Sequence, residues 1–205
     1  MSILNLEELR KKFENYEEIK EGLFIKVSPL SYAETRNAIY HQVEDLAITY
    51  HVLLAEEAEG FTSVIITNEM IDNLFGDVSK EKLHMDAMTN SMALFPLDIM
   101  EGDHFGFGVD NSKIVTNKSK TDGAAVIFYP GVMDQLAMEL GGSYYIIPSS
   151  IHEVIVVKNE DAGFAEFLNQ TIQKVNDAIV EPCERLSYSA YYYDCVAKKF
   201  SKAKK

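Results

Sequence analysis

Apolar residues recur along the first part of the chain with two different periods. From residue 6 to residue 20 they occur at steps of three and four, which predicts an amphipathic helix. The run LFIKV, which begins at residue 23, predicts a strand that ends at Pro29. The apolar segments 45–54 and 61–67 predict two more strands, and the acidic turn between them predicts that they pair as a hairpin.

Two short helices are expected next, because capping residues stand at the start of each. Thr67 or Asn68 is the expected N-cap of the first helix, and Gly76 is expected to end it. Ser79 is the expected N-cap of the second helix. The following stretch is rich in glycine and turn residues, so any weak domain boundary is expected near residues 100–112.

The second part of the chain predicts several strands and two amphipathic helices. The segments 124–129 and 144–147 are apolar on both faces, which predicts central strands covered on both sides. Asp122 and Gly123 are expected to form a hairpin turn before the first of these strands. The other predicted elements are strands at 113–116 and 151–157, a helix at 131–140, a helix with its apolar face from Phe164 to Val175, and a tyrosine-rich strand at 188–194.

Helices mixed with hairpin-connected strands, without regular βαβ alternation, predict an α+β fold. We expect a mainly antiparallel or mixed sheet packed with amphipathic helices in a single domain over residues 1–195. The residues expected to share one core are Val126, Ile127, Phe128, Leu136, Leu140, Ile146, Ile147, Val154 and Val156.

Charge narrows the range of partners. The chain has 205 residues with 19 basic and 32 acidic side chains, a formal charge of −13, which disfavours nucleic-acid binding because phosphate recognition depends on a basic surface. Five of the lysines lie between residues 198 and 205, so residues 196–205 are predicted to be a flexible basic tail. An acidic body of this kind also fits a decoy that mimics nucleic acid.

Other features point to a cytosolic protein without a cofactor. No apolar run approaches the roughly 20 residues of a membrane-spanning helix, and the first residues lack the order of a signal peptide. Cys183 and Cys195 have no metal-ligand spacing and are expected to be reduced, partly buried thiols. None of the five histidines has a ligand-spaced neighbour, so no metal site is expected.

Several strings, among them ITNEMIDNLFG, HMDAMTNSMALFP and YPG…LGG…YYIIPSSIHEV, occur in an order that resembles a known family. The family is a bacterial one of unknown function, domain of unknown function 5688, common in anaerobic Gram-positive species. The resemblance extends from about Phe13 to Asp194. It implies one continuous domain and no particular activity.

The segment PSSIHE contains the residue types of a hydrolytic site: Ser149, Ser150, His152 and Glu153. If the chain is extended from residue 151, Ser150 and His152 stand about 6.6 Å apart and Glu153 points to the opposite face. A zinc-binding HExxH motif is also incomplete, because residue 156 is Val156. We interpret the segment as a turn and a strand start, and a small hydrolase is the alternative.

A cluster of tyrosines near the C-terminus is a candidate contact surface. Tyr188, Tyr191, Tyr192 and Tyr193 place rings on both faces of the predicted C-terminal strand, and Met138 lies on the outer face of its helix. The simpler interpretation is an edge strand whose rings pack on neighbouring strands. Because no catalytic spacing survives, the sequence favours a non-enzymatic module that binds a protein or peptide, without naming the partner.

Overall fold

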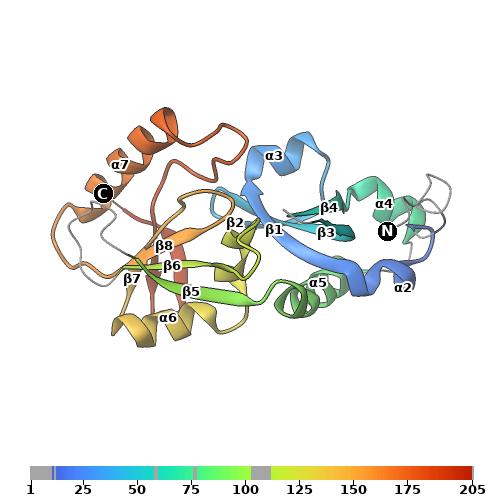
Figure 1. Ribbon diagram of the computed structural model, residues 1–205, viewed down its shortest axis with the longest axis horizontal. Coiled ribbons are helices and arrows are strands. Elements are labelled where there is room, and N and C mark those ends of the chain that lie inside the picture. Colours follow the sequence, from blue (N-terminus) through green and yellow to red (C-terminus); the bar gives the residue numbers. More distant parts are fainter. Residues whose placement is uncertain (1–10, 12, 58–59, 76–77, 103–111, 205) are drawn as a thin grey trace.

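The computed structural model describes residues 11, 13–57, 60–75, 78–102 and 112–204 (Figure 1). The predicted helix end at Gly76, His104 and most of the possible boundary at 100–112 lie outside these ranges. Within them the chain forms two antiparallel sheets with helices on both faces of each. The predicted α+β fold with a single-domain arrangement is confirmed, and the strands are divided between two sheets.

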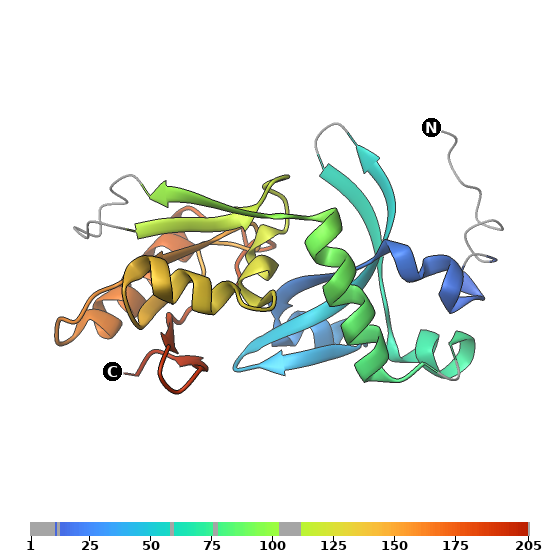
Figure 2. The ribbon, with the colours of Figure 1, turned by 90° about the horizontal axis from the view of Figure 1, so that it is seen from below.

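The first sheet has the strand order β1-β3-β2, with β4 also paired to β3. Its strands are β1 (Leu23–Pro29), β2 (Tyr40–Val43), β3 (Leu46–Glu57) and β4 (Gly60–Ile65). The predicted strand that ends at Pro29 and the predicted hairpin of β3 with β4 are confirmed. Figures 1 and 2 show α5 (Lys80–Leu94) across one face of this sheet, and Figure 1 shows α3 (Leu30–Thr35) over the other.

Local capping explains where the helices of this half begin. The side chain of Thr67 accepts a hydrogen bond from the Met70 N–H at the start of α4 (Asn68–Leu74), and Ser79 accepts one from the Lys82 N–H at the start of α5. The predicted helix over residues 6–20 is interrupted. Asn15 is extended and caps the separate short helix α2 (Tyr16–Ile19), which the 3-10 turn η1 (Lys20–Gly22) follows.

The second sheet has the strand order β10-β9-β7-β8-β6-β5. In this sheet, helix α6 (Val132–Leu140) lies on one face and α7 (Phe164–Ala178) lies on the other (Figures 1 and 2). The strands are β5 (Leu97–Gly102), β6 (Ser112–Asn117), β7 (Tyr144–Ile147), β8 (Val154–Val157), β9 (Tyr191–Asp194) and β10 (Lys199–Lys202).

The apolar run after Asp122 was wrongly predicted as a central strand. It forms the buried 3-10 helix η2 (Gly123–Phe128), which packs against β6 and β1 and so lies between the two sheets. Asp122 adopts the left-handed conformation, with φ 51°, and directs the chain into this turn. Short apolar runs are buried equally well as a strand or a helix, so their composition does not distinguish the two.

One hydrophobic core extends through both halves of the molecule. It joins side chains of β1 and β3 to η2, α6 and the inner face of the second sheet. All residues predicted for a shared core lie in it or pack against it except Ile147, which belongs to a second cluster beneath α7. Phe167, within the segment from Phe164 to Val175 whose apolar residues were predicted to form the inner face of α7, is exposed.

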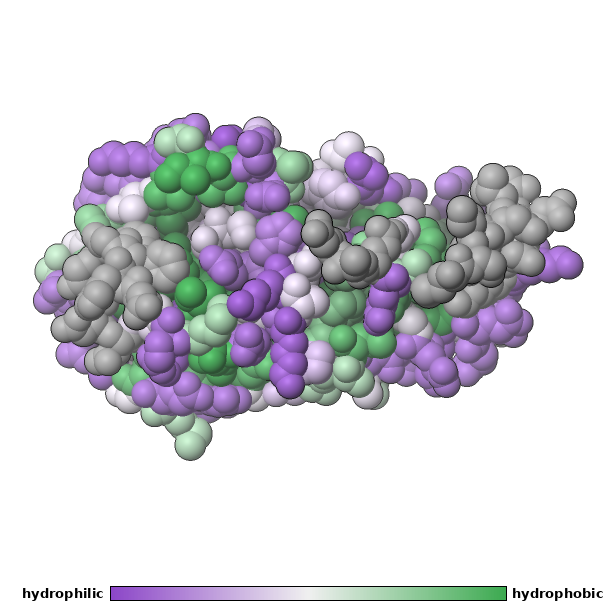
Figure 3. Space-filling model, in the orientation of Figure 1, coloured by the Kyte–Doolittle hydropathy of each residue, from purple (hydrophilic) through white to green (hydrophobic). Residues whose placement is uncertain are grey.

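The chain after Cys195 was predicted to be a flexible tail, and this is wrong for Lys199–Lys202. These residues pair with β9 as strand β10. No helix in the described ranges is both long enough and apolar enough to cross a membrane. Figure 3 shows hydrophilic side chains over much of one face of the molecule, with apolar patches on the half that carries α7.

Candidate functional site

Strand β10 forms an edge of the six-stranded sheet. It pairs with β9, with Ser201 opposite Tyr192 and Lys199 opposite Asp194. The Ala203 N–H donates to the Ala190 carbonyl at 2.9 Å, which continues the same register. Alternate residues of an antiparallel strand direct their backbone groups to opposite sides, so the N–H and C=O groups of Phe200 and Lys202 face away from β9. The outer side of β10 has no paired strand in the described part of the chain.

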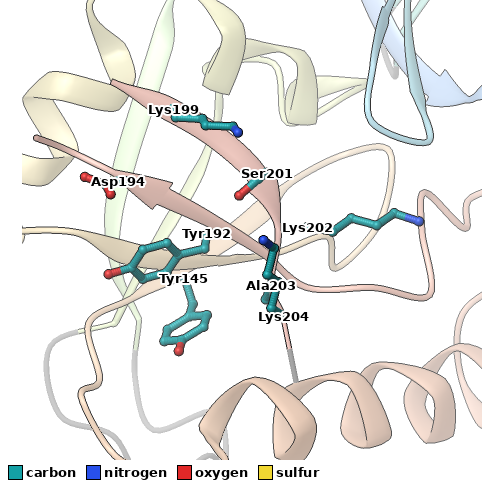
Figure 4. A pocket seen from close by; sticks show the side chains of 8 residues that line it. All are labelled: Tyr145, Tyr192, Asp194, Lys199, Ser201, Lys202, Ala203 and Lys204. Carbon is teal, nitrogen blue, oxygen red and sulfur yellow. The ribbon is translucent and has the colours of Figure 1, made fainter. Parts of the chain in front are cut away.

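A groove of about 370 Å³ lies beside this edge (Figure 4). The rings of Tyr145 on β7 and Tyr192 on β9 form one wall, with their centroids 5.0 Å apart. Both rings are partly buried and pack at the margin of the cluster beneath α7. Lys199, Ser201 and Lys204 line the other side. The groove therefore combines aromatic surface with cationic side chains.

The charges in and around this groove differ in how they are balanced. Lys202 is held by Asp45, with its Nζ 3.0 Å from the carboxylate. Lys199 and Lys204 are exposed and form no ion pair within the described residues. Asp194 accepts hydrogen bonds from the backbone N–H groups of the next turn, each at 2.9 Å. The lysines without a partner can therefore meet an anionic ligand.

The structure separates the residues predicted to form a tyrosine contact surface. Tyr191 and Tyr193 are buried on the face that packs against the main core, so their rings are not exposed for contact with a partner. The Tyr191 hydroxyl donates to Asp45 at 2.7 Å, and the Tyr193 hydroxyl donates to Asp134 at 2.5 Å. Burial, together with the Asp134 carboxylate, raises the pKa of Tyr193 to about 12. Both tyrosines therefore stabilise the packing of the sheet.

The other predicted contact residues lie apart from each other. Tyr192 lies in the groove, where alternation along the strand places it on the α7 side. Tyr188 precedes β9 and is exposed, and its hydroxyl bonds Arg185 and Asp177. Met138 is 83% exposed on α6, which covers the opposite face of the sheet. Sequence reasoning missed Tyr145, although its place in the alternating pattern of β7 puts it on the same face as the second-cluster residue Ile147.

The segment PSSIHE forms a compact turn in which the serines bond the backbone. The Ser150 hydroxyl accepts a hydrogen bond from the His152 backbone N–H at 3.0 Å, and the Ser149 N–H donates to the Ile147 carbonyl. The following strand begins at Val154, so the expectation of an extended chain from residue 151 is wrong. Ser149 lines an apolar pocket of about 220 Å³ beneath α7 that no histidine lines.

The His152 ring is engaged at both nitrogens. Nδ1 accepts a hydrogen bond from the Asp122 backbone N–H at 3.1 Å, and Nε2 lies 3.5 Å from Glu184 Oε1. The carboxylate beside the ring is therefore that of Glu184, and not that of Glu153. A catalytic base needs a nitrogen directed at its nucleophile, and the contacts of Ser149 and Ser150 do not include this ring.

The sequence profile of the family of unknown function DUF5688 matches residues 5–105 and 110–195. The chain belongs to this family. The resemblance predicted from its motifs is confirmed. Neither a curated protein nor a solved structure matches the chain.

In this DUF5688 member, the described cysteines and histidines do not form a metal-binding cluster. Cys183 is exposed, which differs from the predicted partial burial, whereas Cys195 is half-buried and its sulfur accepts a hydrogen bond from Ser143 at 3.4 Å. Among the described residues, no three His, Cys, Asp or Glu side chains are placed to hold a metal ion. The groove beside β10, with its aromatic and cationic side chains, is therefore the best candidate for a functional site.

Proposed function

We propose that this chain is a binding module for an acidic peptide segment, which lies extended along β10 with alternate side chains directed over the sheet face that carries Tyr192. The observation that carries the proposal is the combination of an aromatic wall with a strand edge and two lysines that have no pairing partner among the described residues. Extended peptides commonly add a strand to such an edge, and alternate side chains then enter a neighbouring groove.

Charge supports an acidic partner. Of the 19 basic residues, five lie between residues 198 and 205, so the rest of the chain has 14 basic against 32 acidic side chains, a net of −18. The groove is thus a local cationic region on a strongly acidic protein. A short peptide with a few carboxylates meets only this region, whereas a long polyanion also meets the repulsive remainder.

Backbone geometry defines how the peptide is held. The outward N–H and C=O groups of Phe200 and Lys202 supply the hydrogen bonds of an added strand. Side chains of that strand alternate between two faces, so every second residue of the peptide faces Tyr192 and the lysines. The module therefore selects for charge and aromatic or aliphatic character at alternate positions.

The first experiment measures binding by fluorescence anisotropy with a labelled peptide of alternating glutamate and valine. A peptide of alternating lysine and valine and a single-stranded oligonucleotide are the comparison ligands. We expect the double variant Lys199→Gln/Lys204→Gln to weaken binding of the acidic peptide by about tenfold or more, since two close charges are lost. The matched variant Lys80→Gln/Lys174→Gln makes the same change in net charge on exposed lysines of α5 and α7.

Equal losses in the two double variants would show that net charge alone controls binding and would overturn the proposed site. Tighter binding of the oligonucleotide than of the acidic peptide would replace the peptide with a nucleic-acid partner.

A second experiment tests the strand addition itself. Lys202→Ala and Lys202→Pro both remove the ion pair with Asp45, and only proline also removes the outward N–H. We expect Lys202→Ala to retain peptide binding within a few-fold and Lys202→Pro to abolish it. Similar affinities for the two variants would contradict pairing along β10, whatever the role of the lysines.

A further inference from the structure

The first sheet has an unusual second face. Side chains of β1 and β3 that point toward α5 are apolar, but those that point the other way include Lys26, Ser28, Thr49 and His51. Thr49 is 1% exposed, and Ser28 and His51 are each 7% exposed. Polar groups buried on a sheet face are informative because burial costs free energy unless each group has a partner.

These side chains form part of the lining of a pocket of about 330 Å³. Arg36 and Tyr32 of the α3 region form one wall, and Asp122 and Ile151, from segments of the second half of the chain, form another. Cys183 also lines the pocket and is exposed. Both halves of the molecule therefore contribute to one cavity, and such junctions are common places for small-molecule sites.

The pocket carries more positive than negative charge. Lys26 Nζ lies 2.7 Å from the Asp122 carboxylate, which balances one cation. The Arg36 guanidinium lies over the Tyr32 ring, 5.1 Å from its centroid, and forms no ion pair within the described residues. This excess is local, because the whole chain carries −13.

The polar side chains on the floor are already ordered. His51 Nε2 and Thr49 Oγ1 are 3.0 Å apart, and the Thr49 hydroxyl is 3.4 Å from the Lys26 carbonyl. Burial and the nearby Lys26 charge hold the pKa of His51 well below its usual range, so its ring is neutral at pH 7. The floor is thus a fixed set of neutral polar groups beside two cations.

We propose that this pocket binds a small organic anion. Its carboxylate or phosphate group meets Arg36 and Lys26, and its apolar part packs against the Tyr32 ring and Ile151. The arginine provides a planar, bidentate partner for either anion. Because residues of both halves line the pocket, a bound ligand also connects the two sheets.

Cys183 provides a direct measure of occupancy. We propose alkylation of the intact protein with iodoacetamide, an uncharged reagent, followed by mass spectrometry of the peptide that contains each cysteine. Cys195 lies in the β9–β10 region, outside the pocket, and serves as an internal control. The ligands are benzoate and phenyl phosphate, with benzamide as an uncharged analogue of the same shape.

We expect benzoate or phenyl phosphate to slow alkylation of Cys183 in a saturable manner, by about tenfold at ten times the dissociation constant, and to leave Cys195 unchanged. The anion that acts at the lower concentration identifies the preferred head group. Arg36→Gln should remove most of this protection. Lys174→Gln, which makes the same change in net charge on α7, should retain it.

Three results would overturn the proposal. One is an unchanged alkylation rate of Cys183 at saturating concentrations of both anions, and another is equal protection by benzamide. The third is full protection in the Arg36→Gln variant. Arg36 is exposed and does not line the groove beside β10, so this outcome is distinguishable from a failure of peptide binding.

Discussion

The two sheets of this protein are built on the same antiparallel plan but differ in the polarity of their faces. Strand β8 of the six-stranded sheet is buried at every position, and its apolar side chains pack on α6 and η2 on one side and on α7 on the other. In the first sheet, β1 and β3 present a continuous apolar face to α5, whereas their other face mixes the apolar Phe24 and Ala47 with polar residues. Their other face has polar side chains and a pocket.

This difference locates the two proposed sites. The centre of the sheet with two apolar faces is covered by α6 and α7, and the groove that carries charged side chains lies at the edge strand β10. A sheet with one polar face has room above that face, and the pocket lies there. The comparison teaches that buried polar residues in strands show where a face is not filled by apolar packing.

The largest effect is expected in the apolar layer of the second sheet. Leu136 of α6 is fully buried, so Leu136→Ala should lower the free energy of unfolding by about 2–5 kcal/mol through lost burial and a cavity. Met138 on the same helix is 83% exposed, and Met138→Ala should change it by less than about 0.5 kcal/mol. Urea titration measures both, and similar losses would contradict this placement of the helix.

A smaller effect is expected from the ion pair on the polar face of the first sheet. The side chains of Lys26 and Asp122 are 21% and 17% exposed, so a double-mutant cycle with Lys26→Met and Asp122→Asn should give a coupling of about 1–2 kcal/mol. Asparagine tolerates the left-handed conformation at residue 122. The exposed pair of Lys20 and Glu17 should give less than about 0.5 kcal/mol. Equal couplings would mean that the polar face is as open to solvent as the surface.

The polar face should also make stability depend on pH. Burial lowers the pKa of His51 in the folded protein. Below about pH 6.5, the ordinary pKa of histidine, the unfolded chain therefore binds the proton more readily than the folded one. The free energy of unfolding is therefore highest above that pH, where His51 is neutral in both states. It decreases as the pH falls, by at most about 1.4 kcal/mol per pH unit.

Urea titrations at intervals between pH 7 and pH 5 test this dependence. The wild type should lose stability through this range, and His51→Gln should have a shallower slope. The prediction is wrong if His51→Gln leaves the slope unchanged.

The smallest effect concerns the serine turn. Ser150→Ala removes the acceptor of the His152 backbone N–H and should cost about 0.5–1.5 kcal/mol. Ser149→Ala should be neutral within about 0.5 kcal/mol. A serine-reactive fluorophosphonate probe should label neither residue. Stoichiometric labelling that one of these substitutions abolishes would support the alternative of a small hydrolase.

Local patterns predicted much of the fold. Alternation along LFIKV and the hairpin that follows it gave β1, β3 and β4, and the capping residues Thr67 and Ser79 gave the starts of α4 and α5. These elements depend on neighbours in the sequence, so the residue types are sufficient. The prediction of a strand before Tyr129 was wrong because an apolar segment that is buried on all sides has no period that distinguishes a strand from a 3-10 helix.

The sites were less predictable. The alternation of side chains along a strand shows which residues share a face of the sheet, but it does not show which other segment covers that face. Sequence alone grouped Tyr191, Tyr192 and Tyr193, but packing buried the first and third and left Tyr192 in the groove. The polar pattern of Lys26, Thr49 and His51 was already visible in the strands, and only its contact with Asp122 and Ile151 made it a pocket.

Sequence by itself thus determined the α+β composition, the order of most elements, the family and the net charge. The elements and the family motifs depend on residues close together in the chain, and the net charge is a sum over residues. Tertiary structure decided that residues 199–202 pair as a strand, that His152 bonds Asp122 and Glu184, and that two sheets share one core. Each of these depends on contacts between segments far apart in the chain, where burial and partner geometry outweigh local preference.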